Sequence, residues 1–312
     1  MKIGVIGSSG FLGNNVVEVL DGHDVIKGGR SYGYDSDFYV DATDYNSVSN
    51  WIKLHSITHI VNLAATCGGI GLNKKHPFEL WLQTTQITAA VLKACITHRI
   101  ERIVMLGTVC SYAAENPVPF NEEHLMNHGM PEPTNRAYGV SKLNGLIGAQ
   151  AASQEHSLDV INLIPVNMYG PHDHFDLENS HVIPALINKI QHAIDNGLQS
   201  VEVWGTGNAY REFLYVEDCA EAILKALNGP PTNKLMNVGT GSEISIKGLT
   251  SKLARIMGFE GHFVWKSDKP DGQLRRCLDV SRIQSNLGWK AKTDLDAGLT
   301  KTVEWYRSQE WS

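Results

Sequence analysis

The chain has 312 residues, a net charge of −6 and 42% hydrophobic residues, enough to bury a sizeable core in one large domain or two. It has no long Lys/Arg cluster that would favour nucleic acid or an anionic membrane as partner, and no apolar run near the roughly 20 residues of a membrane span. The short, Gly-rich N-terminus is unlike a signal peptide. The five cysteines are scattered without a Cys-x-x-Cys pair, which argues against a disulfide framework and predicts a reducing, cytoplasmic location.

The first two-thirds of the chain alternates short apolar runs with longer amphipathic segments. The apolar runs are rich in Val, Ile and Leu, as expected for strands covered on both faces, and they lie at Lys2–Ile6, Asp24–Lys27, His59–Leu63, Arg102–Leu106 and Asp159–Ile164. Helices are predicted between them at Phe11–Leu20, Tyr45–Leu54, Phe78–His98 and Tyr138–His156. This alternation predicts an α/β fold, a Rossmann-type doubly wound parallel sheet with right-handed crossovers.

After Pro165 the rhythm loosens into a smaller mixed α/β lobe. Helices are predicted at Val182–Asn196, Val216–Leu227, Ile246–Met257 and Leu295–Gln309, with strands at Val201–Trp204 and Leu235–Val238. We therefore expect a dinucleotide-binding domain over residues 1–165 and a mainly substrate-binding lobe over residues 166–312. A segment near 205–240 is expected to return to the first domain.

A glycine-rich turn, Gly7-Ser8-Ser9-Gly10-Phe11-Leu12-Gly13, joins the first strand to the first helix. Glycines there permit a tight turn and a close approach of the backbone to a pyrophosphate, and the helix N-terminus adds free N–H groups and a positive dipole end. Such a pattern alone is weak evidence, but its position between a first strand and a first helix predicts a dinucleotide site.

The end of the second strand distinguishes NAD from NADP, because NAD enzymes usually carry an acid there for the ribose 2′-hydroxyl. This chain reads Lys27-Gly28-Gly29-Arg30, which has no acid and two cations. Arg30 is suited to bind a 2′-phosphate through two parallel hydrogen bonds, so the sequence favours NADP(H), although Arg30 can also be a solvated loop residue. Asp41 either accepts from the adenine amino group or caps the helix near Tyr45.

Tyr138 and Lys142 are four residues apart on a predicted helix and therefore share a face. A nearby ammonium lowers the pKa of a phenol, which suits a tyrosine that protonates a developing alkoxide. Thr108 follows a strand end, where ligand sites lie in such sheets, and can bond the same oxygen. The spacing is common, and an ordinary exposed helix face is the alternative.

Taken together, the glycine turn, Asn62-Leu63-Ala64-Ala65, Thr108 and Tyr-x-x-x-Lys resemble the extended short-chain dehydrogenase/reductase superfamily. More specific segments resemble the GDP-L-fucose synthase family nearly end to end. They are Cys67-Gly68-Gly69-Ile70, Thr108-Val109-Cys110, the runs 167–175 and 180–184, Val203-Trp204-Gly205-Thr206-Gly207, Arg211-Glu212-Phe213 and Lys269-Pro270-Asp271-Gly272. The sequence departs from the family pattern where Thr108 replaces the usual Ser, Val109 a hydroxyl residue and Lys189 an Arg.

The resemblance implies an enzyme that epimerises C3 and C5 of GDP-4-keto-6-deoxy-D-mannose and reduces its C4 ketone with NADPH. It implies that Cys110 is the base and His181 the acid, and that Thr108, Tyr138 and Lys142 serve the C4 oxygen and the nicotinamide ribose. With the turn and Arg30, the expected cofactor residues are Gly7, Ser9, Gly10, Phe11, Leu12, Gly13, Arg30, Asp41, Ala64, Ala65, Tyr138, Lys142, Pro165, Asn167 and His181. The expected substrate residues are Asn167, Asn179, Lys189, Trp204, Arg211 and Arg276.

Other interpretations remain open from the sequence. Taken alone, Cys110 is a small buried hydrophobe, His181 a polar residue at a helix start and Trp204 a core side chain. His172-Asp173-His174 suggests a metal site, but such runs occur in loops for many reasons and no metal is expected. The alternative functions are a GDP-sugar 4-ketoreductase or epimerase acting on another deoxy sugar or a heptose, and a catalytically silent NADP-binding regulator. Helices Phe78–His98 and Tyr138–His156 are expected to pair in a homodimer.

Overall fold

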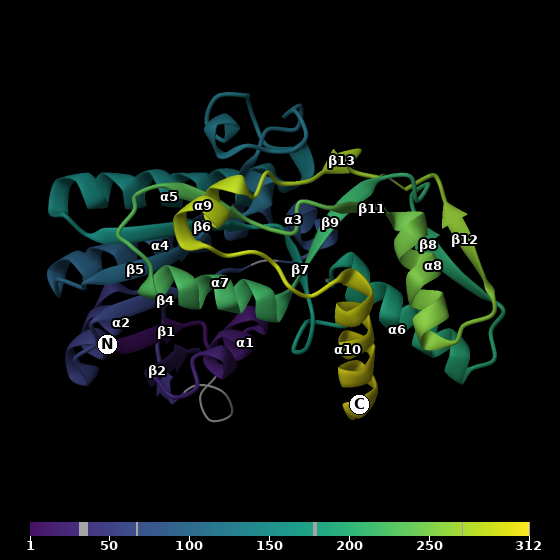
Figure 1. The fold of residues 1–312 in the computed structure, drawn as a ribbon, viewed down its shortest axis with the longest axis horizontal. Helices are drawn as coiled ribbons and strands as arrows, with labels where there is room; N and C mark the ends of the chain where they lie inside the picture. The colour runs from purple at the N-terminus through teal and green to yellow at the C-terminus, as the bar shows by residue number, and fades with distance from the viewer. Residues whose placement is uncertain (31–36, 67, 177–179, 270, 312) are drawn as a thin grey trace.

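The computed structural model describes residues 1–30, 37–66, 68–176, 180–269 and 271–311. Three of the residues singled out in the sequence, Cys67, Pro270 and the predicted substrate residue Asn179, lie outside this description. Two lobes lie side by side, with the N-terminus in one and the C-terminus beside the other (Figure 1). No helix among the described residues is long and apolar enough to span a lipid bilayer.

The first lobe is built on a seven-stranded sheet whose neighbouring strands all run parallel. Its order is β10-β6-β5-β4-β1-β2-β3, with bounds Leu235–Val238, Asp159–Pro165, Arg102–Leu106, His59–Asn62, Lys2–Ile6, Asp24–Gly29 and Phe38–Tyr39. The chain runs outward in one direction from β1 to β3 and then in the other from β4 to β6. The connections therefore diverge between β1 and β4, and this is where ligands bind in open α/β sheets.

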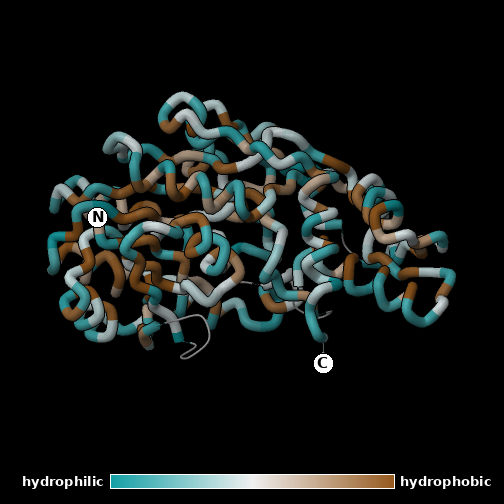
Figure 2. Tube along the Cα trace, turned by 60° about the horizontal axis from the view of Figure 1, so that its bottom comes forward, coloured by the Kyte–Doolittle hydropathy of each residue, from teal (hydrophilic) through white to brown (hydrophobic). Residues whose placement is uncertain are grey.

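Helices cover both faces of this sheet. On one face α1 (Phe11–Val19) packs against α7 (Val216–Asn228), and on the other lie α2 (Tyr45–His55), α4 (Pro77–Thr97) and α5 (Arg136–His156). Apolar stretches concentrate in the interior of this lobe (Figure 2). The predicted Rossmann-type α/β architecture is confirmed, and most predicted elements agree with the observed ones to within two residues.

Arg102 at the start of β5 fixes one end of α7 to the sheet. Its guanidinium forms an ion pair with Asp159 and donates hydrogen bonds to the carbonyl oxygens of Ala226, Leu227 and Gly229. These carbonyls lie at the C-terminus of α7 and have no partner within the helix, so a buried cation satisfies them and favours the negative end of the helix dipole.

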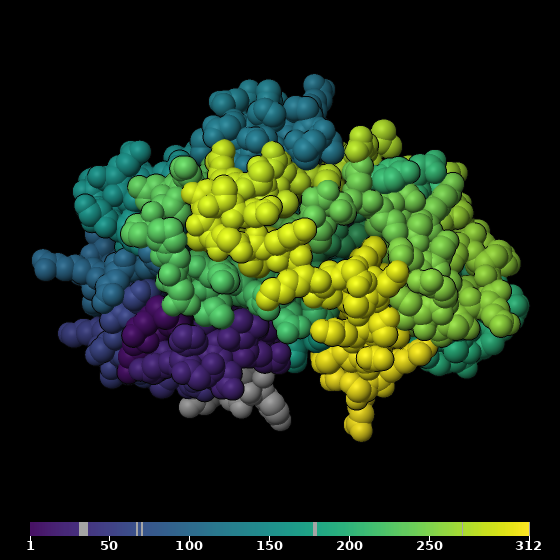
Figure 3. Space-filling view, viewed as in Figure 1, coloured from purple at the N-terminus to yellow at the C-terminus, as the bar shows by residue number. Residues whose placement is uncertain are grey.

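The second lobe is organised around β9 (Tyr210–Tyr215), which pairs with β7 (Asn167–Tyr169), β11 (Glu243–Ser245) and β13 (Arg275–Arg276). A separate parallel pair is formed by β8 (Ser200–Trp204) and β12 (His262–Lys266). Around these strands pack α6 (Val182–Asp195), α8 (Ile246–Met257) and α10 (Leu295–Ser308). After β13 the chain crosses the front of the molecule to the first lobe, where α9 (Ser281–Leu287) packs near β10, and then returns to form α10 (Figures 1 and 3).

The remaining helices are short. They are α3 (Ile70–Lys75) and the single 3-10 turns η1 (Val109–Ser111), η2 (Glu122–His124) and η3 (Pro133–Asn135). The sequence did not predict these short helices and turns, nor α9, β3, β7, β9, β11, β12 or β13.

Glu212 in β9 joins three separate segments. Its side chain is 0% exposed and accepts hydrogen bonds from the backbone N–H groups of Thr240, Gly241 and Leu278. Burial raises the pKa of this carboxyl, while the hydrogen bonds from the three N–H groups lower it. The carboxylate thereby ties β9 to the turn after β10 and to the segment that follows β13.

Candidate active site

The glycine turn after β1 is shaped by close backbone approaches. Gly7 has φ +83°, and a Cβ there would lie 2.9 Å from the backbone nitrogen of Ala64. A Cβ on Gly13 would lie 2.1 Å from the carbonyl oxygen of Gly7, so only glycine fits either position. The N-cap of α1 is Gly10, which offers no side-chain cap. The N–H groups at Phe11 and Leu12 therefore remain suited to bind an anion.

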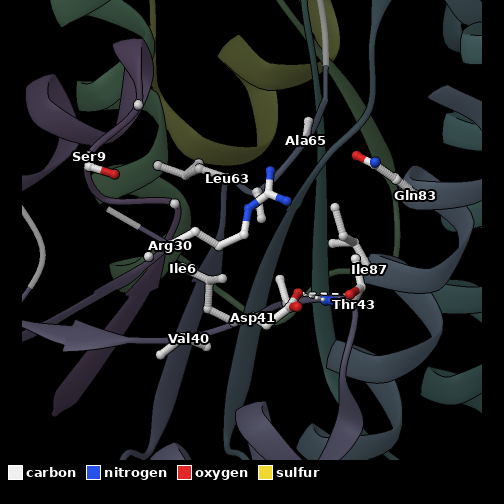
Figure 4. A pocket seen from close by; sticks show the side chains of 15 residues that line it. Ile6, Ser9, Arg30, Val40, Asp41, Thr43, Leu63, Ala65, Gln83 and Ile87 are labelled. Atoms are coloured by element: carbon white, nitrogen blue, oxygen red, sulfur yellow. Dashed lines mark hydrogen bonds between the residues drawn. The ribbon is translucent and has the colours of Figure 1, made fainter. Parts of the chain in front are cut away.

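A pocket of about 250 Å³ opens beside this turn at the carboxyl ends of β1, β2 and β4 (Figure 4). Seven of the predicted cofactor residues line it, namely Gly7, Ser9, Gly10, Arg30, Asp41, Ala64 and Ala65. Gln83 and Ile87 of α4 complete the wall, together with Leu63 and Thr43, and the sequence had singled out none of these for the cofactor. Gln83 and Ile87 were hard to predict for the cofactor pocket, because side chains from a distant helix belong to no local sequence motif.

The charges of the pocket suit a phosphorylated ribose. β2 ends in Gly28 and Gly29 with no carboxylate, and the Arg30 guanidinium extends over the pocket (Figure 4). Asp41 accepts from the backbone N–H of Thr43 at 3.0 Å and from its hydroxyl at 2.7 Å. The Thr43 hydroxyl contributes most to lowering the pKa of Asp41, and the charge of Arg30 lowers it further. The turn and the Arg30 cation thus fit NADP(H).

Asp41 is not a helix cap. The N-cap of α2 is Asp44, whose carboxylate accepts from the N–H groups of Asn46 and Ser47. The capping interpretation offered for Asp41 was therefore wrong by three residues.

The catalytic candidates Thr108 and Cys110 follow β5 directly. Thr108 is the N-cap of η1, and its hydroxyl accepts from the backbone N–H of Cys110 at 3.3 Å. On α5, Tyr138 and Lys142 are one turn apart, and the Lys142 ammonium donates to the carbonyl oxygen of Leu106 at 3.0 Å. Lys142 is therefore held against the same strand end that carries Thr108.

Gly139 lets α5 pack tightly against η1. A Cβ on Gly139 would lie 2.3 Å from the carbonyl oxygen of Cys110, and the Ser111 hydroxyl donates to the carbonyl oxygen of Gly139 at 2.9 Å. The residue next to Tyr138 thus contacts the backbone of Cys110. Gly139 was not among the predicted site residues, although a glycine inside a predicted helix can itself indicate close backbone packing.

One guanidinium of the second lobe contacts Cys110, and a second lies beside the first in the strand register. Arg276 Nη1 donates to the Cys110 sulfur at 3.6 Å, and Arg276 is paired with Arg211 in the β13–β9 register. Arg211 donates to the carbonyl oxygen of Asp271 at 2.9 Å. Burial, and then the charge of Arg276, lowers the pKa of Arg211 to about 10. Two cations held this close together are chemically suited to a divalent anion such as a diphosphate.

His181 is the N-cap of α6 and faces a buried acid. Its Nδ1 lies 4.0 Å from Oδ1 of Asp173, whose side chain is 2% exposed. Asp173 sits in the loop that Asn15 of α1 holds through a hydrogen bond to the carbonyl oxygen of Pro171, at 3.1 Å. A carboxylate in this position is placed to orient the imidazole.

Of the remaining predicted residues, Trp204, Lys189 and Asn167 lie in the second lobe and Pro165 in the first. Trp204 at the end of β8 is 66% exposed, with the ammonium groups of Lys189 and Lys269 5.9 and 5.8 Å from its ring centre. Core packing of Trp204 is thereby excluded, and its ring is an open surface flanked by cations. Pro165 ends β6, and Asn167 donates to the carbonyl oxygen of Glu212 at 3.0 Å.

The His172-Asp173-His174 run does not form a metal site with other ligands. Within the described ranges, no group of three or more His, Cys, Asp or Glu side chains is arranged to hold a metal ion. His172 instead lies 3.5 Å from Glu18 and packs against Trp305.

Comparison with known proteins gives the chain its family. The sequence model of the NAD dependent epimerase/dehydratase family matches residues 3–239. The chain belongs to this family. Within it, GDP-L-fucose synthase 1 of Arabidopsis thaliana is 34% identical over 305 residues, covering 98% of this chain and 93% of that protein. GDP-L-colitose synthase of Yersinia pseudotuberculosis is 31% identical over 314 residues, covering 99% of each.

A solved structure agrees with this placement. GDP-mannoheptose C4 reductase from Campylobacter jejuni, determined with NADP bound, superposes with a TM-score of 0.85 at 25% identity and covers 98% of both chains. Both lobes of this NAD dependent epimerase/dehydratase family member therefore have a counterpart in a known reductase.

Arg30→Gln tests cofactor choice. Losing charge-assisted hydrogen bonds worth about 1.5–3 kcal/mol raises the dissociation constant for NADPH by about 10- to 100-fold. The constant for NADH, which lacks the 2′-phosphate, stays unchanged, and fluorescence titration of both reduced cofactors measures the two. Lys27→Gln is the control, because Lys27 pairs with Asp37 and does not line the pocket. Equal weakening of both cofactors by Arg30→Gln would contradict the role.

Gly139→Ala tests the contact between α5 and η1. Its methyl group meets the carbonyl oxygen of Cys110, so we expect the free energy of unfolding to fall by about 1–3 kcal/mol in urea denaturation. Gly148→Ala in the same helix is the control, since its nearest neighbour is Leu92 at 3.7 Å. That change should raise the free energy of unfolding by about 0.5–1 kcal/mol. The same stabilisation in both variants would rule out a tight contact at Gly139.

Proposed function

We propose that this chain is an NADP(H)-dependent epimerase and reductase that converts GDP-4-keto-6-deoxy-D-mannose to GDP-L-fucose. The observation that carries the proposal is the thiol of Cys110. It sits two residues after Thr108, on a turn that packs against the Tyr138 helix, and it contacts one of two paired guanidiniums. A hydroxyl and a thiol on one turn, a helix bearing a tyrosine packed against that turn, and a guanidinium at the thiol suit a nucleotide-linked keto sugar. The Arabidopsis relative named GDP-L-fucose synthase supports the same substrate.

The ketone at C4 makes both parts of the reaction accessible to one site. It acidifies the protons on C3 and C5, and it later accepts a hydride, which is the chemistry that bound NADPH supplies. Tyr138 gives a proton to the C4 oxygen, Thr108 hydrogen-bonds that oxygen, and Lys142 favours the phenolate form of Tyr138. The Lys142 ammonium, held on the Leu106 carbonyl beside the strand end, supports this assignment.

Epimerisation requires a base on one face of the sugar and an acid on the other. Cys110 takes the base role, because a thiolate is favoured next to a guanidinium. His181 takes the acid role, and its position 4.0 Å from the buried Asp173 carboxylate supports it, because that carboxylate can orient the imidazole. A pure 4-ketoreductase needs neither group, so the presence of both favours epimerisation before reduction.

The GDP end of the substrate is assigned to the second lobe. Arg211 and Arg276 bind the diphosphate oxygens, and the exposed Trp204 offers a flat face to the guanine, with Lys189 beside it.

The exposed apolar side chains of Phe78, Trp81 and Ile147 on α4 and α5 support a homodimer formed through these helices.

Incubation with GDP-4-keto-6-deoxy-D-mannose and NADPH, followed by NMR of the product sugar, tests the function directly. GDP-L-fucose is the expected product. A C4-reduced sugar with unchanged configuration at C3 and C5 would contradict the epimerase assignment and favour a GDP-sugar 4-ketoreductase. The heptose C4 reductase among the structural relatives is an enzyme named for such a reduction.

Two single variants separate the two half-reactions. Tyr138→Phe removes the proton donor and should slow NADPH oxidation by about 10²–10⁴-fold while NADPH still binds. Cys110→Ser should slow deuterium incorporation from solvent at C3 and C5 more than it slows hydride transfer. Normal turnover in Tyr138→Phe would refute the proton donor, and equal slowing of both steps in Cys110→Ser would count against the base.

A further inference from the structure

The contact between Arg276 and Cys110 has a meaning beyond diphosphate binding. We propose that Arg276 is a positioning residue that holds the Cys110 sulfur as a thiolate, so that the base is charged before substrate arrives. The use of this thiolate in epimerisation rests on the proposed function, whereas the charge state of the sulfur can be measured without any substrate.

Arg276 is anchored so that its guanidinium stays at the sulfur. The residue is only 8% exposed, and its Nε donates to Gln273 Oε1 at 3.3 Å while Nη1 donates to Cys110 Sγ at 3.6 Å. Gln273 in turn donates to the carbonyl oxygen of Ala114 at 2.8 Å. Ala114 follows η1 by three residues, so the side chain from the second lobe is fixed to the segment that carries Cys110.

The charges around this contact favour an anion at the sulfur. Arg211 lies beside Arg276 in the strand register, and the charge of Arg276 lowers the pKa of Arg211. The acids that act on Arg211 are Asp271 and Glu132, and the Asp271 carboxylate already accepts from the N–H and the hydroxyl of Thr206, each at 2.7 Å. A thiolate at Cys110 places a negative charge beside the two guanidiniums. Negative charge at Cys110 raises the pKa of Arg211, which favours the charged form of that arginine.

The geometry also leaves Arg276 able to serve the substrate. Its Nε and Nη1 are occupied, whereas Nη2 donates to no acceptor among the residues that the structure describes. One planar guanidinium can therefore hold the sulfur on one edge and a phosphate oxygen on another. Diphosphate binding and thiolate stabilisation then share a single residue.

Alkylation of Cys110 by iodoacetamide tests the proposal, with the modified peptide quantified by mass spectrometry. The reagent is neutral, so a change of local charge does not alter its attraction to the site. In Arg276→Gln we expect the rate at pH 7 to fall by about tenfold, because less of the sulfur is thiolate. At pH 9.5 the variant and the parent should converge, since an ordinary thiol is then mostly ionised.

Two further variants control for packing. Arg276→Lys keeps a cation and should recover part of the rate at pH 7. Arg275→Gln removes the neighbouring, exposed arginine that pairs with Glu243 and should leave the rate unchanged. A purely structural role for Arg276 would instead change the rate by the same factor at both pH values. That outcome, or equal rates at pH 7 for the parent and Arg276→Gln, overturns the proposal.

The alkylation assay and the product assay together distinguish a failure of this proposal from a failure of the proposed function. If the chain fails to convert the GDP-linked sugar but Arg276→Gln still slows alkylation only near neutral pH, the thiolate assignment stands and the substrate is wrong. If GDP-L-fucose forms while alkylation is insensitive to Arg276, the function stands and the positioning role fails.

Discussion

The buried carboxylate of Glu212 is the constraint on which the site depends. It accepts from three backbone N–H groups of segments that are distant in the sequence, and so fixes where the chain after β13 meets β9. Arg211 precedes Glu212 directly, and Arg276 lies two residues before Leu278, which donates to the same carboxylate. The relative position of the two guanidiniums, and through Arg276 the environment of Cys110, follows from this one joint.

The sequence predicted those parts of the fold that local pattern determines. β1 and β5 agree residue for residue, because buried parallel strands are continuous apolar runs between amphipathic helices. β9 and β13 were not predicted, for a physical reason. β13 has two residues, both arginines, and exists only because it pairs with β9 more than 60 residues earlier. Pairing across such a distance leaves no periodicity in either segment.

The candidate site shows the same difference between features set by a local motif and features set by contacts between distant segments. The glycine turn and Arg30 could be predicted because a strand, a turn and a helix N-terminus make a local motif. In the structure Arg30 lines the pocket beside this turn. The contact of Arg276 with Cys110 joins residues 166 positions apart and has no sequence signature. The exposure of Trp204 could not be predicted either, because a tryptophan at a strand end is as consistent with core packing as with an open surface until its neighbours are known.

The hydrogen bond from Asn15 to Pro171 has a mechanical consequence. Asn15 belongs to the helix whose N-terminus faces the expected pyrophosphate, and Pro171 begins the loop that carries Asp173 beneath His181. This one hydrogen bond therefore joins the nucleotide-binding helix to the loop beneath the imidazole directly, outside the sheet, so the cofactor side and the acid side of the site share a mechanical support.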